Sequence, residues 1–241
     1  MDYRQRLFQH YVATHFAALR EISTDACERH LSTFRAYFRR LLPEDKEAKI
    51  LDIGCGYGPF LYFLRKEGYL NVYGVDISPE QVEAAQQLGI DNIYCEDLLP
   101  FLHEHPNAFA CITAFDVVEH FPKGEVLSLL DAVHEALQPG GTFIMQSPNG
   151  ASPFHGIIRY GDFTHELAFT RESVTQVLSI TGFANVHVYP TGPVVHGVLS
   201  SVRWVIWHVI RLLFVLYLAA ETGSVQGYIL TANLIATAQK P

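Results

Sequence analysis

The chain has little positive charge for its length, and this shortage limits its partners. Its 241 residues include 17 lysines and arginines against 25 acidic residues, which gives a formal net charge of -8. A protein that binds phosphate backbones needs a basic surface. We therefore expect no nucleic-acid partner.

Cysteine is also scarce, and no C-x-x-C pair is present. The four thiols are spread along the chain, at Cys27, Cys55, Cys95 and Cys111. This pattern is typical of reduced, buried thiols in a cytoplasmic protein. The first residues do not lead into the apolar core of a secretory signal, and no repeat or low-complexity tract is present. We expect a cytoplasmic protein.

The length suits one α/β domain with additions. Short apolar runs alternate with helical segments, which indicates a mostly parallel sheet. The expected strands are 49–53, 72–76, 92–95, 109–115, 142–146, 184–189 and 227–238. The ligand crevice of such a sheet lies beyond the carboxyl ends of its strands.

Helix signals support this alternation. Ser78 is expected to cap a helix in which Gln81 completes a capping box, and Thr170 is expected to cap residues 170–180. Helices are also expected at 60–66 and 125–137, the latter stopped by Pro139-Gly140.

The two ends of the chain add helices to this domain. Apolar spacing over residues 3–42 predicts two helices, broken at Ser23-Thr24 and ended by Pro43. The expected organisation is an N-terminal helical cap at 1–47 and a main domain at 48–241, with an apolar helical insertion at 191–226.

Three glycines follow the first apolar strand at alternate positions, Gly54, Gly56 and Gly58. Glycines let backbone approach a ligand closely. Asp76 ends the next apolar strand, where an acid can accept hydrogen bonds from ribose hydroxyls. Together these residues predict a nucleoside pocket.

The glycine spacing differs from the G-x-G-x-x-G dinucleotide fingerprint. No basic residue lies near the loop, and Asp52 before it would repel a pyrophosphate. A nicotinamide or nucleotide-sugar Rossmann enzyme is the alternative reading of this loop.

The D-x-G-x-G-x-G pattern of residues 52–58 resembles motif I of class I S-adenosylmethionine (SAM) dependent methyltransferases. Four later segments match that family in order and spacing: 75–76, 96–98, 114–120 and 137–145. The resemblance covers about residues 49–147. It implies a Rossmann-like fold of seven strands with the last one antiparallel, SAM as cofactor and S-adenosylhomocysteine as product.

The resemblance also implies roles for single residues. Asp76 would bind the ribose, Asp97 and Leu98 the adenine, and Tyr11 would cap the cofactor. The predicted cofactor residues are Tyr11, Asp52, Gly54, Cys55, Gly56, Gly58, Asp76, Ile77, Asp97, Leu98, Phe115 and Asp116.

A dense polar cluster follows the fifth strand. Its G-D-F-T-H-E-x-A-F-T stretch resembles methyltransferases of bacterial polysaccharide gene clusters and favours a saccharide or glycan precursor as acceptor. The predicted acceptor contacts are Asn149, Arg159, Tyr160, Asp162, His165 and Glu166. Alternatively, Asp162 and Thr164 build turns and His165 satisfies a backbone carbonyl.

Methyl transfer to a hydroxyl requires alignment and loss of a proton. Histidine is the natural base near neutral pH, and the catalytic candidates are His165 and His120. Alignment without a dedicated base is the alternative. Asp116, Glu119 and Asn149 could approach a cation, but Asp116 is expected to face SAM, so no metal is predicted.

Residues 194–220 are strongly apolar, with Arg203, His208 and Arg211 among two tryptophans. Length alone would permit a membrane span, but the segment lies between two strands of one sheet. Three readings stay open for 198–220: a wall of the acceptor pocket, a peripheral contact with the inner face of a membrane, or a homodimer seam.

The sequence therefore predicts a SAM-dependent O-methyltransferase for a saccharide or other small molecule. One rival is an O-methyltransferase for a phenolic or lipid-quinone acceptor, with the apolar segment as its pocket. A rival of another class is a non-catalytic binding or scaffolding protein with the same fold.

Overall fold

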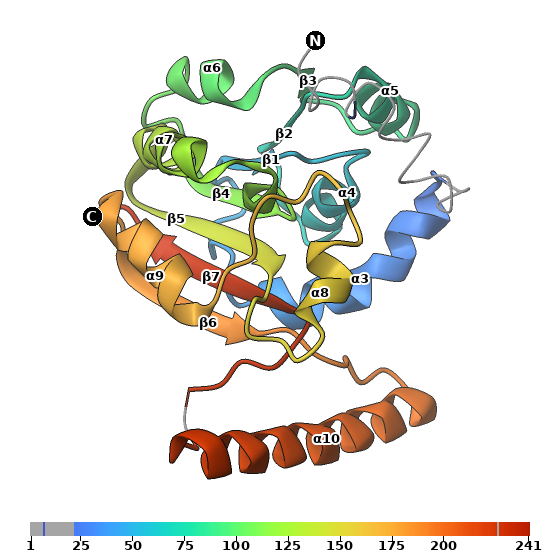
Figure 1. The fold of residues 1–241 in the computed structure, drawn as a ribbon. Helices are drawn as coiled ribbons and strands as arrows, with labels where there is room; N and C mark the ends of the chain where they lie inside the picture. Colours follow the sequence, from blue (N-terminus) through green and yellow to red (C-terminus); the bar gives the residue numbers. More distant parts are fainter. Residues whose placement is uncertain (1–6, 8–21, 226) are drawn as a thin grey trace.

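A computed structural model describes residues 7, 22–225 and 227–241 (Figure 1). The first predicted helix and Tyr11 lie outside this range. A seven-stranded sheet has the order β3-β2-β1-β4-β5-β7-β6. Strand β7 is antiparallel to both neighbours, and the other pairs are parallel. The predicted fold class is confirmed.

The elements follow one another with short connections. The strands are β1 (Ile50–Ile53), β2 (Val72–Asp76), β3 (Ile93–Cys95), β4 (Phe109–Phe115), β5 (Leu137–Pro148), β6 (Ala184–Pro190) and β7 (Asn233–Gln239). The helices are α3 (Thr24–Phe38), α4 (Pro59–Lys66), α5 (Pro79–Gln87), α6 (Leu98–His103), α7 (Lys123–Ala136), α8 (His155–Arg159), α9 (Arg171–Ile180) and α10 (Val198–Thr222), with a 3-10 turn η2 at Val118–His120.

Helices cover both faces of the sheet (Figure 1). On one face, α3 packs on α4, and Phe38, Phe60 and Phe63 join the buried cluster between these helices and the sheet. On the other face, α6, α7 and α9 bury Phe101, Leu129 and residues around them. The apolar β strands are buried from both sides, as expected for a doubly covered parallel sheet.

Both predicted helix caps form, but one predicted capping box does not. The Thr170 hydroxyl accepts from the Ser173 amide at 3.3 Å and completes a capping box at α9. Ser23 caps α3, where the predicted break lies. Ser78 caps α5, but the capping box with Gln81 is wrong: this side chain turns into the protein, and its Oε1 has no hydrogen-bond partner among the described residues.

Two strand predictions need correction. Helix α7 ends at Ala136 and β5 begins at once, so Pro139-Gly140 lies inside the strand. Strand β5 can include Pro139-Gly140 because its pairing with β4 shifts register next to these residues, between Phe109 and Cys111 of β4. Gly140 also adopts φ +76°. The last strand starts at Asn233, not at 227, because the carbonyls of Ile229 and Thr231 bond the Asn149 side chain instead of a strand.

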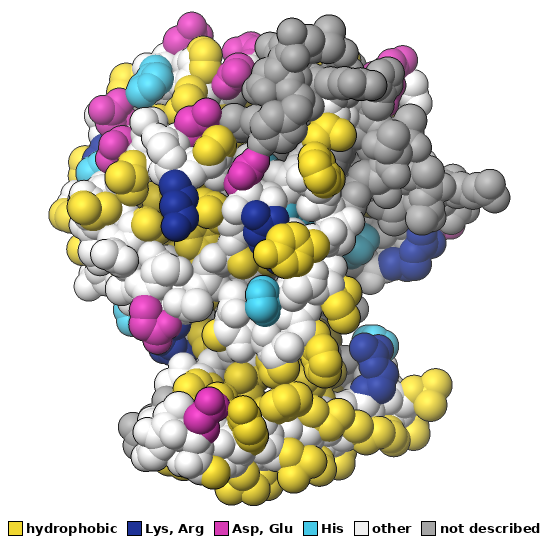
Figure 2. All heavy atoms as spheres, in the orientation of Figure 1, with side chains coloured by type: hydrophobic (Ala, Val, Ile, Leu, Met, Phe, Trp, Pro, Cys, Tyr) yellow, Lys and Arg dark blue, Asp and Glu magenta, His cyan; other side chains and the backbone are white. Residues whose placement is uncertain are grey.

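Helix α10 lies apart from the layers, below the ends of β6 and β7 (Figure 1). It is the one described helix that is long and apolar enough to cross a membrane, and none of its most apolar stretch is buried. Figure 2 shows hydrophobic side chains along this helix. The outer face of the helix carries Val202, Ile206, Val209, Leu213 and Leu216, which are all more than half exposed.

The carboxyl ends of β1, β2 and β4 lie side by side. Ile53 pairs with Val75 on one side and with Ala114 on the other. From β1 the chain builds the sheet outward in one direction through β2 and β3, and from β4 it builds it in the other direction. Open α/β sheets bind ligands in the crevice at such a switch point. The glycine loop, Asp76 and Asp116 therefore meet at one edge.

Candidate functional site

The glycine loop leaves β1 in a conformation that favours glycine. Gly54, Gly56 and Gly58 have φ of +62°, +55° and +80°. A Cβ on Gly54 would lie 2.5 Å from the Cγ2 of Val117, and one on Gly58 would lie 2.8 Å from the Cδ1 of Ile90. Both the left-handed backbone and the close neighbours therefore require glycine at these positions.

Asp76 ties the loop to the end of β2. Its Oδ2 accepts from the Gly56 amide and its Oδ1 from the Ser78 amide, each at 2.8 Å. Burial raises the pKa of Asp76, and these two amides oppose the rise. Each carboxylate oxygen keeps a second lone pair, so the fixed carboxylate can also accept from a ligand hydroxyl.

Asp52 lies beneath the loop and is buried. Its Oδ1 accepts from the Thr113 hydroxyl of β4 at 2.5 Å. Burial raises the pKa of Asp52 to about 7, with Thr113 acting in the opposite direction and the Asp76 charge adding to the rise. This position makes Asp52 a support of the loop rather than an open ligand contact.

The remaining predicted cofactor residues surround the same edge. Asp97 caps α6 by accepting from the Leu99 amide at 3.2 Å and is exposed, while Leu98 is buried beside it. Ile77 is 52% exposed after β2. Cys55 is buried, and burial raises the pKa of its thiol. Phe115 packs on Phe38 and Phe60, with ring centroids 4.4 and 4.5 Å away.

Asp116 follows β4 with φ +56°, an unusual value for a residue other than glycine. The side-chain amide of Gln146 donates to both of its carboxylate oxygens, at 3.3 and 3.2 Å. The Asp116 side chain is exposed to solvent, but the surrounding protein atoms partly desolvate it and raise the pKa of its carboxyl. The hydrogen bonds from Gln146 and the charge of His165 lower this pKa. The strained backbone holds this acid toward the crevice.

The two candidate bases lie together, although they are far apart in the sequence. The rings of His120 and His165 have centroids 4.7 Å apart. The Glu166 and Leu167 amides donate to the Glu119 carbonyl at 2.7 and 3.1 Å, which joins their loop to η2. The loop after β5 is thereby fixed against the turn after β4.

Hydrogen bonds define which nitrogen of each ring carries a proton. The Nδ1 of His165 lies 3.0 Å from the Ile158 carbonyl oxygen, which only accepts. The Nδ1 of His120 lies 2.9 Å from the Thr164 hydroxyl, which donates to Asp162 at 2.6 Å. Both Nδ1 atoms therefore donate, and in the neutral rings both lone pairs are on Nε2.

Burial next to a second histidine keeps His120 neutral. The pKa of His120 is lowered to about 4, first by burial and then by the charge of His165. The neighbouring Glu119 is fully buried. Burial, and then the charge of Asp116, raise the pKa of Glu119 well above its usual range, while its own amide and Ser147 lower it.

Two predicted acceptor contacts are wrong. The Asn149 amide is fully buried and donates to the carbonyls of Ile229 and Thr231 at 2.7 and 2.8 Å. Asp162 is buried and accepts from the amide and hydroxyl of Thr164. Their polar atoms hold the loop, so neither residue is presented to an acceptor; for Asp162 the turn-building alternative is correct.

Arg159 has a role that the sequence did not predict. Its guanidinium donates to the carbonyl oxygens of His165 and Glu166, so it shapes the loop that carries the histidine. Tyr160 beside it is 76% exposed. Tyr160 and Glu166 stay predictions as acceptor contacts.

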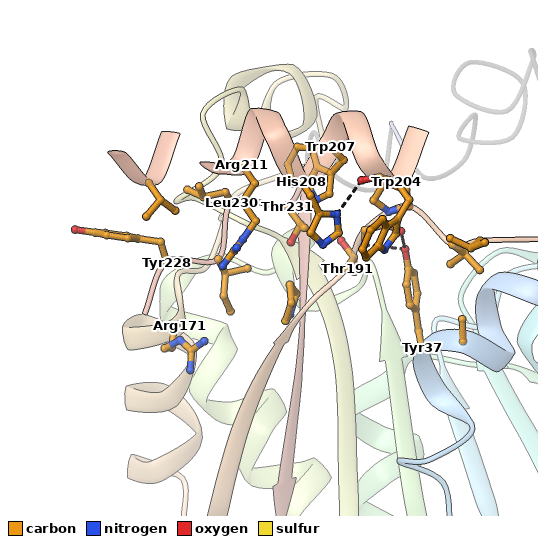
Figure 3. Close-up of a pocket in the computed structure, with 18 of the residues that line it drawn as sticks. Tyr37, Arg171, Thr191, Trp204, Trp207, His208, Arg211, Tyr228, Leu230 and Thr231 are labelled. Carbon is orange, nitrogen blue, oxygen red and sulfur yellow. Dashed lines mark hydrogen bonds between the residues drawn. The ribbon is translucent and has the colours of Figure 1, made fainter. Parts of the chain in front are cut away.

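A second hollow lies at the same edge of the sheet, between α10 and the ends of β6 and β7. This cavity of about 680 Å³ has five residues of α10 in its wall, Trp204, Trp207, His208, Arg211 and Val215. Figure 3 shows the first four facing Thr191 and Thr231. Tyr37 of α3 closes one side, where its hydroxyl accepts from the Gly192 amide at 2.9 Å. The inner face of α10 therefore lines a cavity.

Sequence reasoning missed the partners that orient the candidate residues. Thr113, Gln146 and the Ile158 carbonyl carry no motif signal, because their role depends on strand register and loop shape. Thr164 stands inside the polar segment, and a hydroxyl two residues after an aspartate is a turn signal. Its contact with His120 requires the tertiary fold.

Comparison with known proteins points to one family. A family model described as a methyltransferase domain matches residues 27–188. A ubiquinone biosynthesis O-methyltransferase of Xylella fastidiosa is 29% identical over 107 residues, which are 42% of each chain. An uncharacterized protein of Haemophilus influenzae is 28% identical over 126 residues, 48% of each. The chain spans less than half the length of these curated relatives.

Solved structures agree on the fold. A SAM-dependent methyltransferase of Archaeoglobus fulgidus is 24% identical, with a TM-score of 0.64 over 87% of this chain and 94% of that one. A phosphoethanolamine N-methyltransferase of Haemonchus contortus in complex with SAM has a TM-score of 0.58 at 16% identity, over 89% and 52%. With a glycine loop, Asp76 and Asp116 at the expected edge, the chain belongs to the class I SAM-dependent methyltransferases.

Proposed function

We propose that this chain transfers the methyl group of SAM to a hydroxyl of a saccharide or glycan precursor. The observation that carries the hydroxyl assignment is the contact between His120 and His165 beside Asp116. Two imidazoles whose Nδ1 atoms donate to fixed oxygens leave Nε2 as a proton acceptor at the edge where the cofactor is expected. SAM supplies the electrophilic methyl group when bound, so the protein has to align the acceptor and accept its proton.

The cofactor would lie along the glycine loop. The left-handed backbone of residues 54–58 permits close approach of the methionine and ribose parts, and Asp76 is fixed for the ribose hydroxyls. Asp97 is exposed, and its carboxylate would accept from the adenine amino group. These assignments extend the family resemblance to single residues.

The cavity beside α10 supports a polar acceptor. Arg171 and Arg211 offer planar donors, and Trp204 and Trp207 offer flat apolar surfaces. Such mixed walls suit a sugar ring, which has polar edges and apolar faces. The exposed outer face of α10 supports an acceptor that is presented on a lipid anchor at the inner face of a membrane.

A phenolic or quinone acceptor is the second candidate. The partial match to a ubiquinone biosynthesis O-methyltransferase favours it. A flat aromatic ring could also lie between the tryptophans, and a long isoprenoid tail would account for the apolar helix.

Transfer of labelled methyl from SAM distinguishes the two acceptor classes. The full chain is incubated with lipid-linked and free glycan precursors and with catechol-type quinone precursors. We expect label in the glycan fraction, and loss of transfer in His165→Ala with unchanged S-adenosylhomocysteine affinity. Label in the quinone precursors alone would replace the saccharide proposal, and normal turnover of His165→Ala would remove this residue as the base.

A further inference from the structure

Three electron-rich side chains converge at the junction of η2 and the loop after β5. One ligand atom from each of Glu119, His120 and His165 lies within 4.8 Å of the other two. The residues come from two separate segments, which the backbone bonds from Glu166 and Leu167 to Glu119 hold together. The cluster therefore depends on the fold and is not a chance neighbourhood on one helix.

Glu119 is the unusual member of this cluster. It is fully buried, and no hydrogen bond from the described residues reaches either carboxylate oxygen. A buried carboxylate without a partner costs several kcal/mol. A protonated carboxyl would also need a hydrogen-bond partner. The Ser147 hydroxyl and the Glu119 amide are near enough to favour the charged form, but neither makes a hydrogen bond to the carboxyl, so neither form is satisfied by the residues that the structure describes.

The histidines are oriented as metal ligands usually are. In each ring Nδ1 donates to a fixed oxygen: the Ile158 carbonyl for His165, and the Thr164 hydroxyl, itself bound to Asp162, for His120. Such second partners fix the tautomer and direct the Nε2 lone pair to a cation. A cation is the partner that two imidazole nitrogens and a carboxylate can share.

We propose that Glu119, His120 and His165 bind one divalent first-row transition-metal ion. Two imidazoles and one carboxylate suit ions such as Mn²⁺, Fe²⁺, Co²⁺ or Zn²⁺ better than Mg²⁺ or Ca²⁺, which prefer oxygen ligands alone. The sequence predicts no metal, because Asp116 is expected to face SAM and His165 lies far along the chain from the Glu119-His120 pair. The fold instead brings His165 to the Glu119-His120 pair.

The ion would act in the same site as the proposed methyl transfer, and its role there rests on that proposed function. A hydroxyl oxygen bound to a divalent cation loses its proton at a lower pH. His120 and His165 would then hold the ion and the acceptor oxygen would lose its proton to solvent, which replaces a histidine as the base. Binding of the ion itself does not depend on which acceptor is used.

Direct metal binding tests the inference. Untagged full-length chain is stripped with a chelator and titrated with Co²⁺, while visible d–d absorption and equilibrium dialysis report geometry and stoichiometry. We expect one ion per chain and visible bands typical of nitrogen ligands, with Mg²⁺ in excess failing to displace it. Glu119→Gln and His165→Ala should each weaken binding by more than about 100-fold, as loss of a direct ligand costs more than loss of a second partner.

Matched controls distinguish the loss of a metal ligand from a general loss of folding. His187→Ala removes an exposed histidine of β6 outside the cluster and should bind Co²⁺ as the wild type does. Affinity for S-adenosylhomocysteine and the melting temperature show whether each variant is folded. His165→Ala changes a residue on a loop, so it tests the site even if the buried Glu119→Gln variant does not fold.

Different experimental results would disprove the metal site and the proposed function. Wild type that binds no Co²⁺ or Zn²⁺ at micromolar concentration, or variants that bind as well as wild type, would overturn the inference. Methyl transfer that survives complete chelation would overturn the role of the ion and leave the proposed function standing. Specific ion binding without transfer to any hydroxyl acceptor would support the site and count against the proposed function.

Discussion

The backbone amide of Glu166 donates to the backbone carbonyl of Glu119 at 2.7 Å. With the Leu167 amide, which donates to the same carbonyl at 3.1 Å, it joins the turn after β4 to the loop after β5. It brings His165 next to His120, whose ring centroid is 4.7 Å away. The candidate site is thus built from two loops at one sheet edge, as functional sites of open α/β sheets usually are.

Arg159 should control this arrangement without contacting the cofactor. Its guanidinium holds the carbonyls of His165 and Glu166. We expect Arg159→Met to lower kcat on the order of tenfold, because charge-assisted hydrogen bonds contribute about 1.5–3 kcal/mol. Steady-state kinetics with calorimetry checks this, with Arg35→Met as control; a matching loss of S-adenosylhomocysteine affinity would contradict it.

At Gly54, the close approach of Val117 should destabilise an alanine variant more than the left-handed backbone conformation alone would. A Cβ at Gly54 lies 2.5 Å from the Cγ2 of Val117, whereas one at Gly89 meets nothing within 4 Å, and both glycines have positive φ. Gly54→Ala should therefore lose about 1–3 kcal/mol more free energy of unfolding than Gly89→Ala. Urea denaturation measures the difference, and equal losses would show that the clash is absorbed without cost.

Asp52 should make stability depend on pH. Its pKa in the folded protein, about 7, is above its ordinary value of 3.8. Between these values the folded state holds a proton that the unfolded chain has released, so the free energy of unfolding falls as pH rises from about 4 to 7. Asp52→Asn keeps an oxygen for Thr113 and should gain stability relative to wild type over that window. Parallel urea titrations check this; a constant difference between the two proteins would contradict the raised pKa.

The outer face of α10 should determine how the protein associates. Leu213 and Leu216 are 61% and 55% exposed there. We expect wild type to sediment with anionic liposomes and the double variant Leu213→Glu, Leu216→Glu to lose more than about tenfold in partitioning. Leu70→Glu, at a 66% exposed leucine elsewhere, is the control. Light scattering that shows a dimer and no liposome binding would instead favour the dimer seam.

The sequence predicts the sheet well because each strand has a local signal. β2 and β4 have the predicted bounds, since apolar runs end there at an acid or a turn. The prediction fails where tertiary contacts decide. Asn149 takes the carbonyls of Ile229 and Thr231 and shortens β7, and Pro139-Gly140 is absorbed into β5 by a shift in register.

The sequence predicts which residues lie in the site better than it predicts what each of them does there. Asp76 and the glycines can be recognised in the sequence because the glycines follow one strand directly and Asp76 ends the next strand along the chain, which is its neighbour in the sheet. The sequence predicts Asn149, Arg159 and Asp162 as acceptor contacts. In the structure Asn149 and Asp162 instead hold the loop from within, and Arg159 donates to its carbonyls. The sequence around Glu119 gives no sign that its carboxyl is fully buried and that no hydrogen bond from the described residues reaches it; only the packed structure reveals this.

Cofactor binding tests the central claim most directly. Wild type and Asp76→Ala are titrated calorimetrically with S-adenosylhomocysteine, with NAD as the control ligand. We predict micromolar affinity of wild type for S-adenosylhomocysteine alone, reduced about tenfold or more in Asp76→Ala because a charged hydrogen-bond acceptor is lost. Binding of NAD in its place, or of neither ligand, would contradict the assignment of the glycine loop to SAM.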